Sequence, residues 1–147
     1  MLKNISVIIS TYNSPDWLRK VLWGYNTQTY RNFEVVIADD GSRDDTRQML
    51  ADIASEMFFP IVHTWHEDNG FQKCTILNKA IMACSTDYIL MSDGDCIPRP
   101  DFVEQHIKFR EEGFFLSGGY HKLPMDLSQK ISREDIYSGR CFEMGWL

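Results

Sequence analysis

The chain has 147 residues, which corresponds to one domain, and its 15 Lys and Arg against 21 Asp and Glu give a net charge of −6. Hydrophobic residues make up 44%, so the bulk of the chain is expected to fold, and the acidic balance argues against nucleic acid as a partner. Neither a membrane-spanning run nor a signal peptide is expected. The four cysteines lack the spacing of a metal site, and a chain of this size needs no disulfides, so we expect a cytoplasmic protein with reduced thiols.

Strand-like and helix-like segments alternate along the chain. The β-branched run 5–9 predicts a buried strand. Ser14 before Pro15 is typical of a helix start, and the apolar spacing that follows to Tyr25 predicts one helix face. Ser42 and Asp45 have the spacing of a variant capping box for a second helix. The remaining expected elements are strands over 33–38, 61–65, 88–91 and 114–116, and helices over 49–57, 76–84 and 100–113.

This alternation predicts an α/β fold with a mainly parallel central sheet and helices on both faces. Right-handed crossovers would place the loops that follow the strands along one edge, where ligands of such sheets bind. The pattern covers residues 1–119 and weakens over 120–147, so we expect an α/β core followed by the beginning of a second region.

Polar and acidic residues collect where three of the expected strands end. They are Thr11-Tyr12-Asn13, Asp39-Asp40-Gly41-Ser42 and Asp93-Gly94-Asp95. Three such segments on one edge would concentrate negative charge, which indicates a cationic or donor-rich ligand among them. Dinucleotide and P-loop glycine motifs are absent from the sequence.

Asp93, Gly94 and Asp95 carry the clearest chemical signal. Residues i and i+2 of an extended segment point the same way, so both carboxylates can face one cation, and the glycine lets a ligand approach the backbone. Carboxylate oxygens suit Mg²⁺ or Mn²⁺, whose coordination is usually completed by substrate phosphates and water. The alternative is a polar turn in which one of the acids caps the next element.

Asp39 and Asp40 also allow two interpretations. The acids could favour the start of the following helix through its dipole, or they could accept hydrogen bonds from a base or ribose. Thr11, Tyr12 and Asn13 offer hydroxyls, an amide and an aromatic face, which would suit a nucleoside.

Four motifs in this order, together with Gln28-Thr29-Tyr30 and the segment 66–73, resemble glycosyltransferase family 2 with the GT-A fold. Within it, the chain is similar to the N-terminal sugar-transferase domains of bacterial chondroitin polymerases. The resemblance implies a Rossmann-like nucleotide-diphospho-sugar transferase that takes part in polysaccharide biosynthesis. It implies a metal-dependent, inverting transfer from a UDP-sugar to a glycan, lipid-linked or protein acceptor. The absence of a membrane-spanning run leaves open a peripheral association at the inner face of the membrane.

The same resemblance implies roles for individual residues. Asp40 would accept from uracil, Asp95 would bind Mn²⁺ or Mg²⁺ directly, and Asp93 would lie near the ribose and a metal-bound water. The other nucleotide-sugar-binding positions would be Thr11, Tyr12, Asn13, Asp39, Lys73, Asn78 and Gly94. Leu77 stands where the family often carries an arginine, so Lys73 would supply the charge for the diphosphate.

The catalytic base is not assigned by these motifs. The resemblance makes 1–119 the donor-binding core and 120–147 the start of an incomplete acceptor-side region. The late acids that could serve as a base are Asp126, Glu134, Asp135 and Glu143. Two alternatives stay open: a non-catalytic nucleotide-sugar-binding fragment, and another metal-dependent nucleotide-phosphate enzyme.

Overall fold

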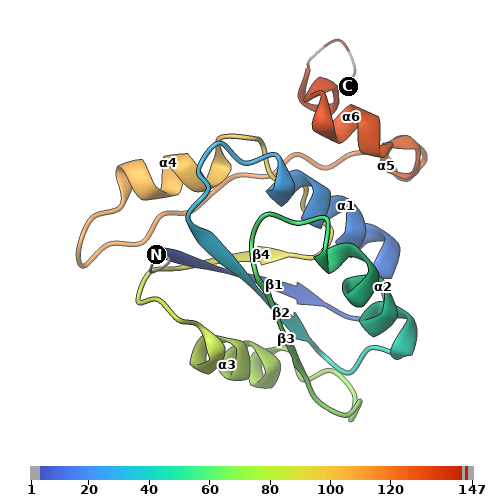
Figure 1. The fold of residues 1–147 in the computed structure, drawn as a ribbon, viewed down its shortest axis with the longest axis vertical. Coiled ribbons are helices and arrows are strands. Elements are labelled where there is room, and N and C mark those ends of the chain that lie inside the picture. Colours follow the sequence, from blue (N-terminus) through green and yellow to red (C-terminus); the bar gives the residue numbers. More distant parts are fainter. Residues whose placement is uncertain (1–3, 144, 146–147) are drawn as a thin grey trace.

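A parallel sheet forms the centre of the computed structural model, which describes residues 4–143 and 145 (Figure 1). Over this part of the chain the sheet has four strands in the order β3-β2-β1-β4. They are β1 (Ile5–Thr11), β2 (Phe33–Asp39), β3 (Ile61–Trp65) and β4 (Ile89–Asp93). The predicted mainly parallel sheet is therefore confirmed, since each neighbouring pair runs parallel.

Helices cover both faces of this sheet, as predicted. α1 (Pro15–Asn26), α2 (Asp44–Ala54) and α4 (Phe102–Phe109) lie above it in Figure 1, and α3 (Lys73–Ala83) lies below. The sequence periodicity explains the arrangement, because β1 and β2 are buried along their whole length and their side chains alternate between two apolar layers.

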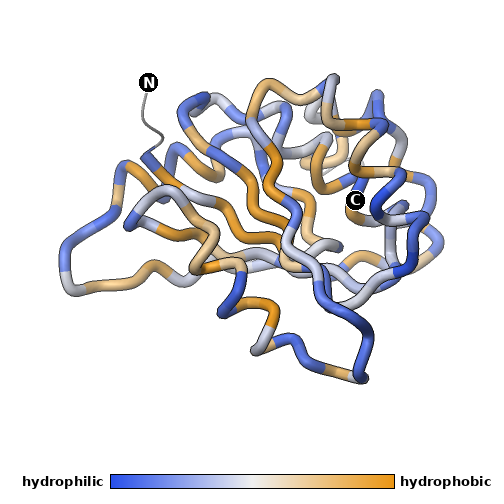
Figure 2. Tube along the Cα trace, turned by 60° about the horizontal axis from the view of Figure 1, so that its bottom comes forward, coloured by the Kyte–Doolittle hydropathy of each residue, from blue (hydrophilic) through white to orange (hydrophobic). Residues whose placement is uncertain are grey.

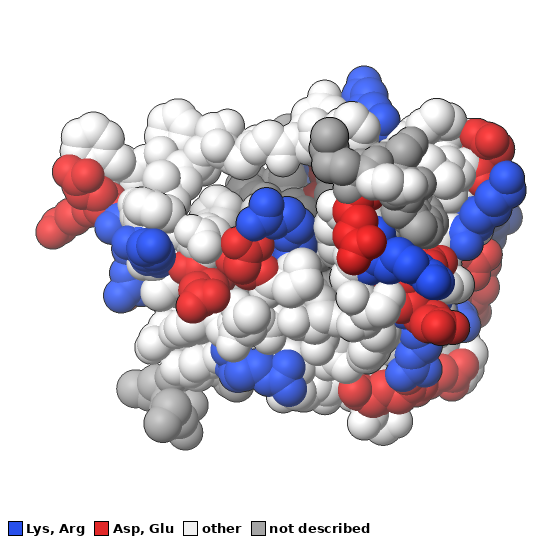
Figure 3. Space-filling view, turned by 90° about the horizontal axis from the view of Figure 1, so that it is seen from above, with Lys and Arg blue, Asp and Glu red and all other residues white. Residues whose placement is uncertain are grey.

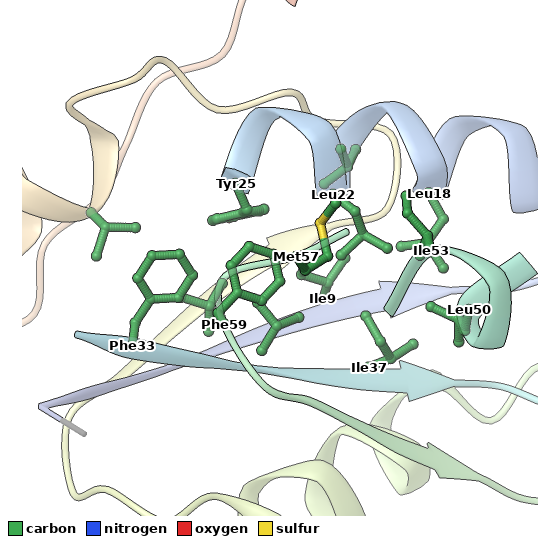
Figure 4. Close-up of a cluster of buried hydrophobic side chains, with 14 of the residues drawn as sticks. Ile9, Leu18, Leu22, Tyr25, Phe33, Ile37, Leu50, Ile53, Met57 and Phe59 are labelled. Carbon is green, nitrogen blue, oxygen red and sulfur yellow. The ribbon is translucent and has the colours of Figure 1, made fainter. Parts of the chain in front are cut away.

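The larger apolar layer lies between the sheet and α1 and α2 (Figure 4). Leu18, Leu22 and Tyr25 of α1 point down onto Ile9 and Phe33, and all five are fully buried. Each such side chain contributes about 1.5–3 kcal/mol through burial. In Figure 2 the strands accordingly appear as the most hydrophobic stretches of the chain, enclosed by polar loops.

The other face of the sheet packs on α3. Ile8, Val36 and Ala38 meet Ile76 and Ala80 there, and all five are buried. This helix is exposed on its outer side, so it is held to the sheet by one narrow apolar stripe.

Three short elements follow the sheet: α5 (Met125–Lys130), α6 (Arg133–Tyr137) and the 3₁₀ helix η1 (Arg140–Phe142). Ile131, Ile136 and Cys141 bury against one another and against Trp23 of α1 and Ile97. On the face shown in Figure 3, acidic and basic side chains are interspersed. Cys74, Cys84, Cys96 and Cys141 are all free, as expected, and no helix among the described residues has the length and apolarity needed to cross a membrane.

Two local predictions are wrong. Residues 114–116 form no strand, and Phe114 and Phe115 are exposed, because no strand partner lies beside them in the described chain. Ser42 is not a capping residue: α2 begins at Asp44 after Arg43, and the Ser42 hydroxyl instead accepts the backbone N–H of Asn13 at 2.8 Å. The predicted start of α1 at Pro15 is confirmed.

Candidate functional site

The carboxyl ends of β1, β2 and β4 meet at one edge of the sheet. The register pairs Thr11 with Asp39 and Ser10 with Asp93, so the polar segments predicted from the sequence lie side by side. The connections from β1 to β3 run over the face of α1 and α2, and the return to β4 runs over the face of α3. The strand order therefore reverses between β1 and β4, and this is where open α/β sheets bind ligands.

Asp39 is a buried anchor at the end of β2. Its Oδ1 accepts the backbone N–H of Ser42 at 2.8 Å, and its Oδ2 lies 2.8 Å from Nε2 of His63 on β3. Burial raises the pKa of this carboxyl, but the hydrogen bonds from His63 and Ser42 outweigh burial and hold the pKa below its ordinary value. Asp39 therefore remains ionised and fixes the loop that carries Asp40.

Asp40 also has a histidine partner. Its Oδ1 lies 2.7 Å from Nε2 of His66, and its Oδ2 accepts the backbone N–H of Gln72 at 2.9 Å. Its own backbone N–H donates to the carbonyl oxygen of Thr11. The carboxylate is thereby held in one orientation, and each oxygen retains a lone pair with which it can accept from a ligand.

The segment after β1 links the loops around it. Asn13 has a positive φ of 47°, and its Oδ1 accepts the backbone N–H of Arg43 at 2.9 Å. The exposed Tyr12 donates its hydroxyl to Asp68, and this hydrogen bond raises the pKa of Tyr12. Thr11 is buried, and its Oγ1, which is itself shielded from solvent, has no hydrogen-bond partner among the described residues.

Asp93 ends β4 on the other side of β1. Its Oδ1 accepts from both the Lys73 Nζ and the Ser10 Oγ at 2.7 Å, and these bonds lower the pKa of Asp93. Gly94 then turns the chain so closely that an added Cβ would lie 2.7 Å from the carbonyl oxygen of Ser10. Glycine at this position therefore allows the tight turn that brings the carboxylates of Asp93 and Asp95 close together.

Asp93, Asp95 and Cys96 each place one ligand atom within 4.8 Å of the other two. Burial, and then the carboxylates of Asp95 and Asp93, raise the pKa of the Cys96 thiol to about 11. Its soft sulfur suits Mg²⁺ or Mn²⁺ less well than the carboxylate oxygens do. Both described hydrogen bonds to Asp93 end on Oδ1, which leaves Oδ2 for a cation. Two carboxylates at an open, polar edge fit Mg²⁺ or Mn²⁺.

The remaining predicted residues lie elsewhere. Asn78 is exposed on α3. Asp126 is on α5, Glu134 on α6 and Glu143 after η1. Asp135 accepts from Ser132 in the capping box of α6 and pairs with Arg140, so its carboxylate is already fully engaged.

Sequence reasoning missed the residues that hold the carboxylates. His63 and His66 bind Asp39 and Asp40, and Ser10 binds Asp93. A signal was present for His66, because it directly follows β3, whose last residue is the register partner of Asp39.

Comparison with known proteins identifies the family to which the chain is similar. The profile of Glycosyl transferase family 2 matches residues 6–138. The chain is 28% identical over 109 residues to the chondroitin synthase of Escherichia coli, covering 74% of this chain and 16% of that protein.

Two solved structures are similar to it. One is S. aureus TarS 1–349 in complex with UDP-GlcNAc, with a TM-score of 0.51 and 28% identity, covering 63% of this chain and 26% of that one. The other is a mannosyltransferase from Pyrobaculum calidifontis in complex with GDP-Man and Mn²⁺, with a TM-score of 0.65 and 24% identity, covering 74% of this chain and 32% of that one. The chain spans less than a third of the length of each of these three proteins.

Proposed function

Because the chain belongs to glycosyltransferase family 2, we propose that it binds a UDP-sugar with Mg²⁺ or Mn²⁺ and serves in transfer of the sugar to a glycan, lipid-linked or protein acceptor. The observation that carries this proposal is the arrangement at the carboxyl edge. Asp40 and the pair Asp93 and Asp95 lie on opposite sides of the end of β1, and partners from the chain orient Asp40 and Asp93. A nucleoside diphosphate needs a base contact and a cation-supported phosphate contact of this kind.

Asp40 would recognise the base. Uracil presents a ring N–H that a carboxylate accepts, whereas the equivalent cytosine nitrogen is itself an acceptor, so an oriented carboxylate favours uridine. Thr11, Tyr12 and Asn13 would lie on the nucleoside side of the site, and the exposed ring of Tyr12 offers an aromatic face for it. The similarity to TarS, which was solved with UDP-GlcNAc, supports uridine as the nucleoside.

Asp95 and Asp93 would hold the cation, as their carboxylate chemistry and proximity support. When bound, Mg²⁺ or Mn²⁺ supplies Lewis-acid and electrostatic stabilisation to a departing nucleoside diphosphate. Lys73 lies beside Asp93 and would add positive charge on the diphosphate side.

An inverting displacement also requires a carboxylate that accepts the proton of the acceptor hydroxyl. Asp135 is a weak candidate for this role, because Ser132 and Arg140 already occupy its oxygens. Of the late acids, Asp126, Glu134 and Glu143 are therefore the better candidates for an acceptor-side base. Residues 120–143, which pack on α1 in part through α6, would begin the acceptor side.

Titration calorimetry tests the donor site directly. The unmodified chain should bind UDP in the presence of Mn²⁺, and Asp95→Asn should remove the metal-dependent part of the binding. Asp44→Asn, which neutralises an exposed acid on α2, is the matched control and should bind normally. Unchanged, metal-dependent binding by Asp95→Asn, or no binding of UDP by the unmodified chain, would contradict the proposal.

A further inference from the structure

Asp40 is connected through His66 to a lysine on the helix below the sheet. The Nε2 atom of His66 lies 2.7 Å from Asp40 Oδ1, and the Nδ1 atom on the other side of the ring lies 3.3 Å from Nζ of Lys79. The side chains of His66 and Asp40 are only 9% and 7% exposed, while Lys79 is exposed on α3. The imidazole ring of His66 thus links the exposed ammonium group of Lys79 to the nearly buried carboxylate of Asp40.

Asp40 and Lys79 both favour the same tautomer of His66. A lysine ammonium group can only donate hydrogen bonds, so the ring nitrogen that faces it must accept. The ring proton therefore lies on Nε2, which donates to Asp40. In the opposite tautomer, Nδ1–H would face the ammonium group and the Nε2 lone pair would face the carboxylate, so both contacts would be repulsive.

This tautomer matters because Asp40 has its second oxygen fixed by Gln72. With Nε2–H on one oxygen and the backbone N–H on the other, the carboxylate cannot rotate without losing a hydrogen bond. Its remaining lone pairs then point in fixed directions, which is the requirement for selecting a ligand N–H over a ligand acceptor.

We propose that Lys79 and His66 are positioning residues for base recognition: Lys79 donates to Nδ1 and so fixes the His66 ring with its proton on Nε2, and His66 holds Asp40 oriented to accept from a pyrimidine ring N–H. This inference rests on the proposed function, since it takes Asp40 to be the base contact. It assigns a specificity role to Lys79, which does not itself contact the carboxylate.

The tautomer of His66 can be measured by NMR in the absence of nucleotide, independently of the proposed function. Ring ¹⁵N chemical shifts of His66 should show an accepting Nδ1 and a protonated Nε2 in the unmodified chain. Lys79→Met should shift the Nδ1 resonance, because the donor to Nδ1 is lost, while Nε2 should stay protonated because Asp40 still faces it. Lys108→Met, which removes an exposed lysine from α4, should leave both resonances unchanged. Identical His66 shifts in the unmodified chain and Lys79→Met would overturn the role of Lys79.

Binding then tests the effect on recognition. Lys79→Met should weaken UDP binding about three- to tenfold and reduce the preference for UDP over CDP, the scale of one hydrogen bond. His66→Gln retains an N–H donor near the Nε2 position and should keep more of the preference for UDP than His66→Leu. Since the lysine acts through the ring, Lys79→Met should add little to the loss in His66→Leu.

Additive losses in the double variant, or an unchanged UDP to CDP ratio in Lys79→Met, would overturn the proposal while leaving uridine binding established. If the unmodified chain binds no uridine nucleotide, the proposed function fails and the role in base recognition fails with it. The two failures are distinguishable because only the second removes the binding of the unmodified chain.

Discussion

Lys73, the first residue of α3, places its Nζ 2.7 Å from Oδ1 of Asp93, the last residue of β4. The carboxylate that would help to hold a divalent cation therefore already has a positive partner. Both side chains are partly exposed, 39% and 55%, so solvent screens the pair and its own contribution to stability is small. The ion pair matters mainly for ligand binding, because the positive charge of Lys73 weakens the binding of a cation at Asp93 and favours the binding of a diphosphate.

Lys73→Met should therefore act in opposite directions on two ligands. Binding of Mn²⁺ alone should tighten by up to about fivefold, the scale of an exposed ion pair, because Asp93 loses a competing positive charge. Binding of UDP with Mn²⁺ present should weaken about three- to tenfold, because a phosphate contact is lost. Calorimetry with each ligand checks both, with Lys108→Met as control, and two changes in the same direction would contradict this account.

Gly94→Ala should disrupt the cation side of the site. The added methyl group would lie 2.7 Å from the backbone carbonyl oxygen of Ser10, which cannot move without disturbing β1. We expect a loss of about 1–3 kcal/mol in the free energy of unfolding and weaker Mn²⁺ binding. Gly119→Ala is the matched control, since nothing lies within 4 Å of its added Cβ. Equal denaturation midpoints for the two variants would count against the close approach at Gly94.

The sheet could be predicted because β1 and β2 are largely apolar, buried runs and β3 and β4 begin with apolar residues, which can be recognised without knowledge of the neighbouring strands. The prediction of a strand over 114–116 was wrong because an apolar run forms a strand only where a partner strand lies beside it. The capping box at Ser42 failed because the Asn13 backbone, 29 residues away, takes the hydroxyl. The similar Ser132 and Asp135 do cap α6, but the residues around them lack the helical periodicity that would have indicated a helix.

Some residues of the candidate site could likewise be predicted from the sequence and others could not. Asp39, Asp40 and Asp93 could be predicted because each lies at, or directly after, the end of a strand that the sequence indicates: the buried β2 for the first two and the partly exposed β4 for Asp93. His63 could not, because it lies 24 residues from Asp39 and only the register of β2 against β3 brings the two together. The place of His66 directly after β3 was a signal, but its contact with Asp40, 26 residues away, depends on the same register. The acidic residues of the site can thus be predicted from the local sequence, whereas the contacts that orient their carboxylates depend on tertiary packing.

Asp40→Ala should weaken UDP binding by about ten- to a hundredfold. The variant loses a charge-assisted hydrogen bond to the uracil N–H, which is worth about 1.5–3 kcal/mol. The preference for UDP over CDP should fall with it, whereas Mn²⁺ binding without nucleotide should be unchanged because Asp93 and Asp95 remain. Calorimetry with the three ligands separates these effects. Retention of the full preference for UDP would show that another group reads the base.

The segment that holds α6 should loosen in acid. Hydrogen bonds from the side chain and backbone of Ser132, and then the pairing with Arg140, lower the pKa of Asp135 from 3.8 to about 2. Because the carboxyl is more acidic when folded, its contribution to stability is complete above about pH 4 and is lost as the pH falls from about 4 to about 2. Asp135→Asn should therefore increase amide hydrogen exchange across 131–142 at pH 6, and the difference from the unmodified chain should shrink toward pH 2. Asp126→Asn, an exposed acid on α5, is the control. A difference between Asp135→Asn and the unmodified chain that stayed constant from pH 6 to pH 2 would show that the charge of Asp135 is not what holds the segment.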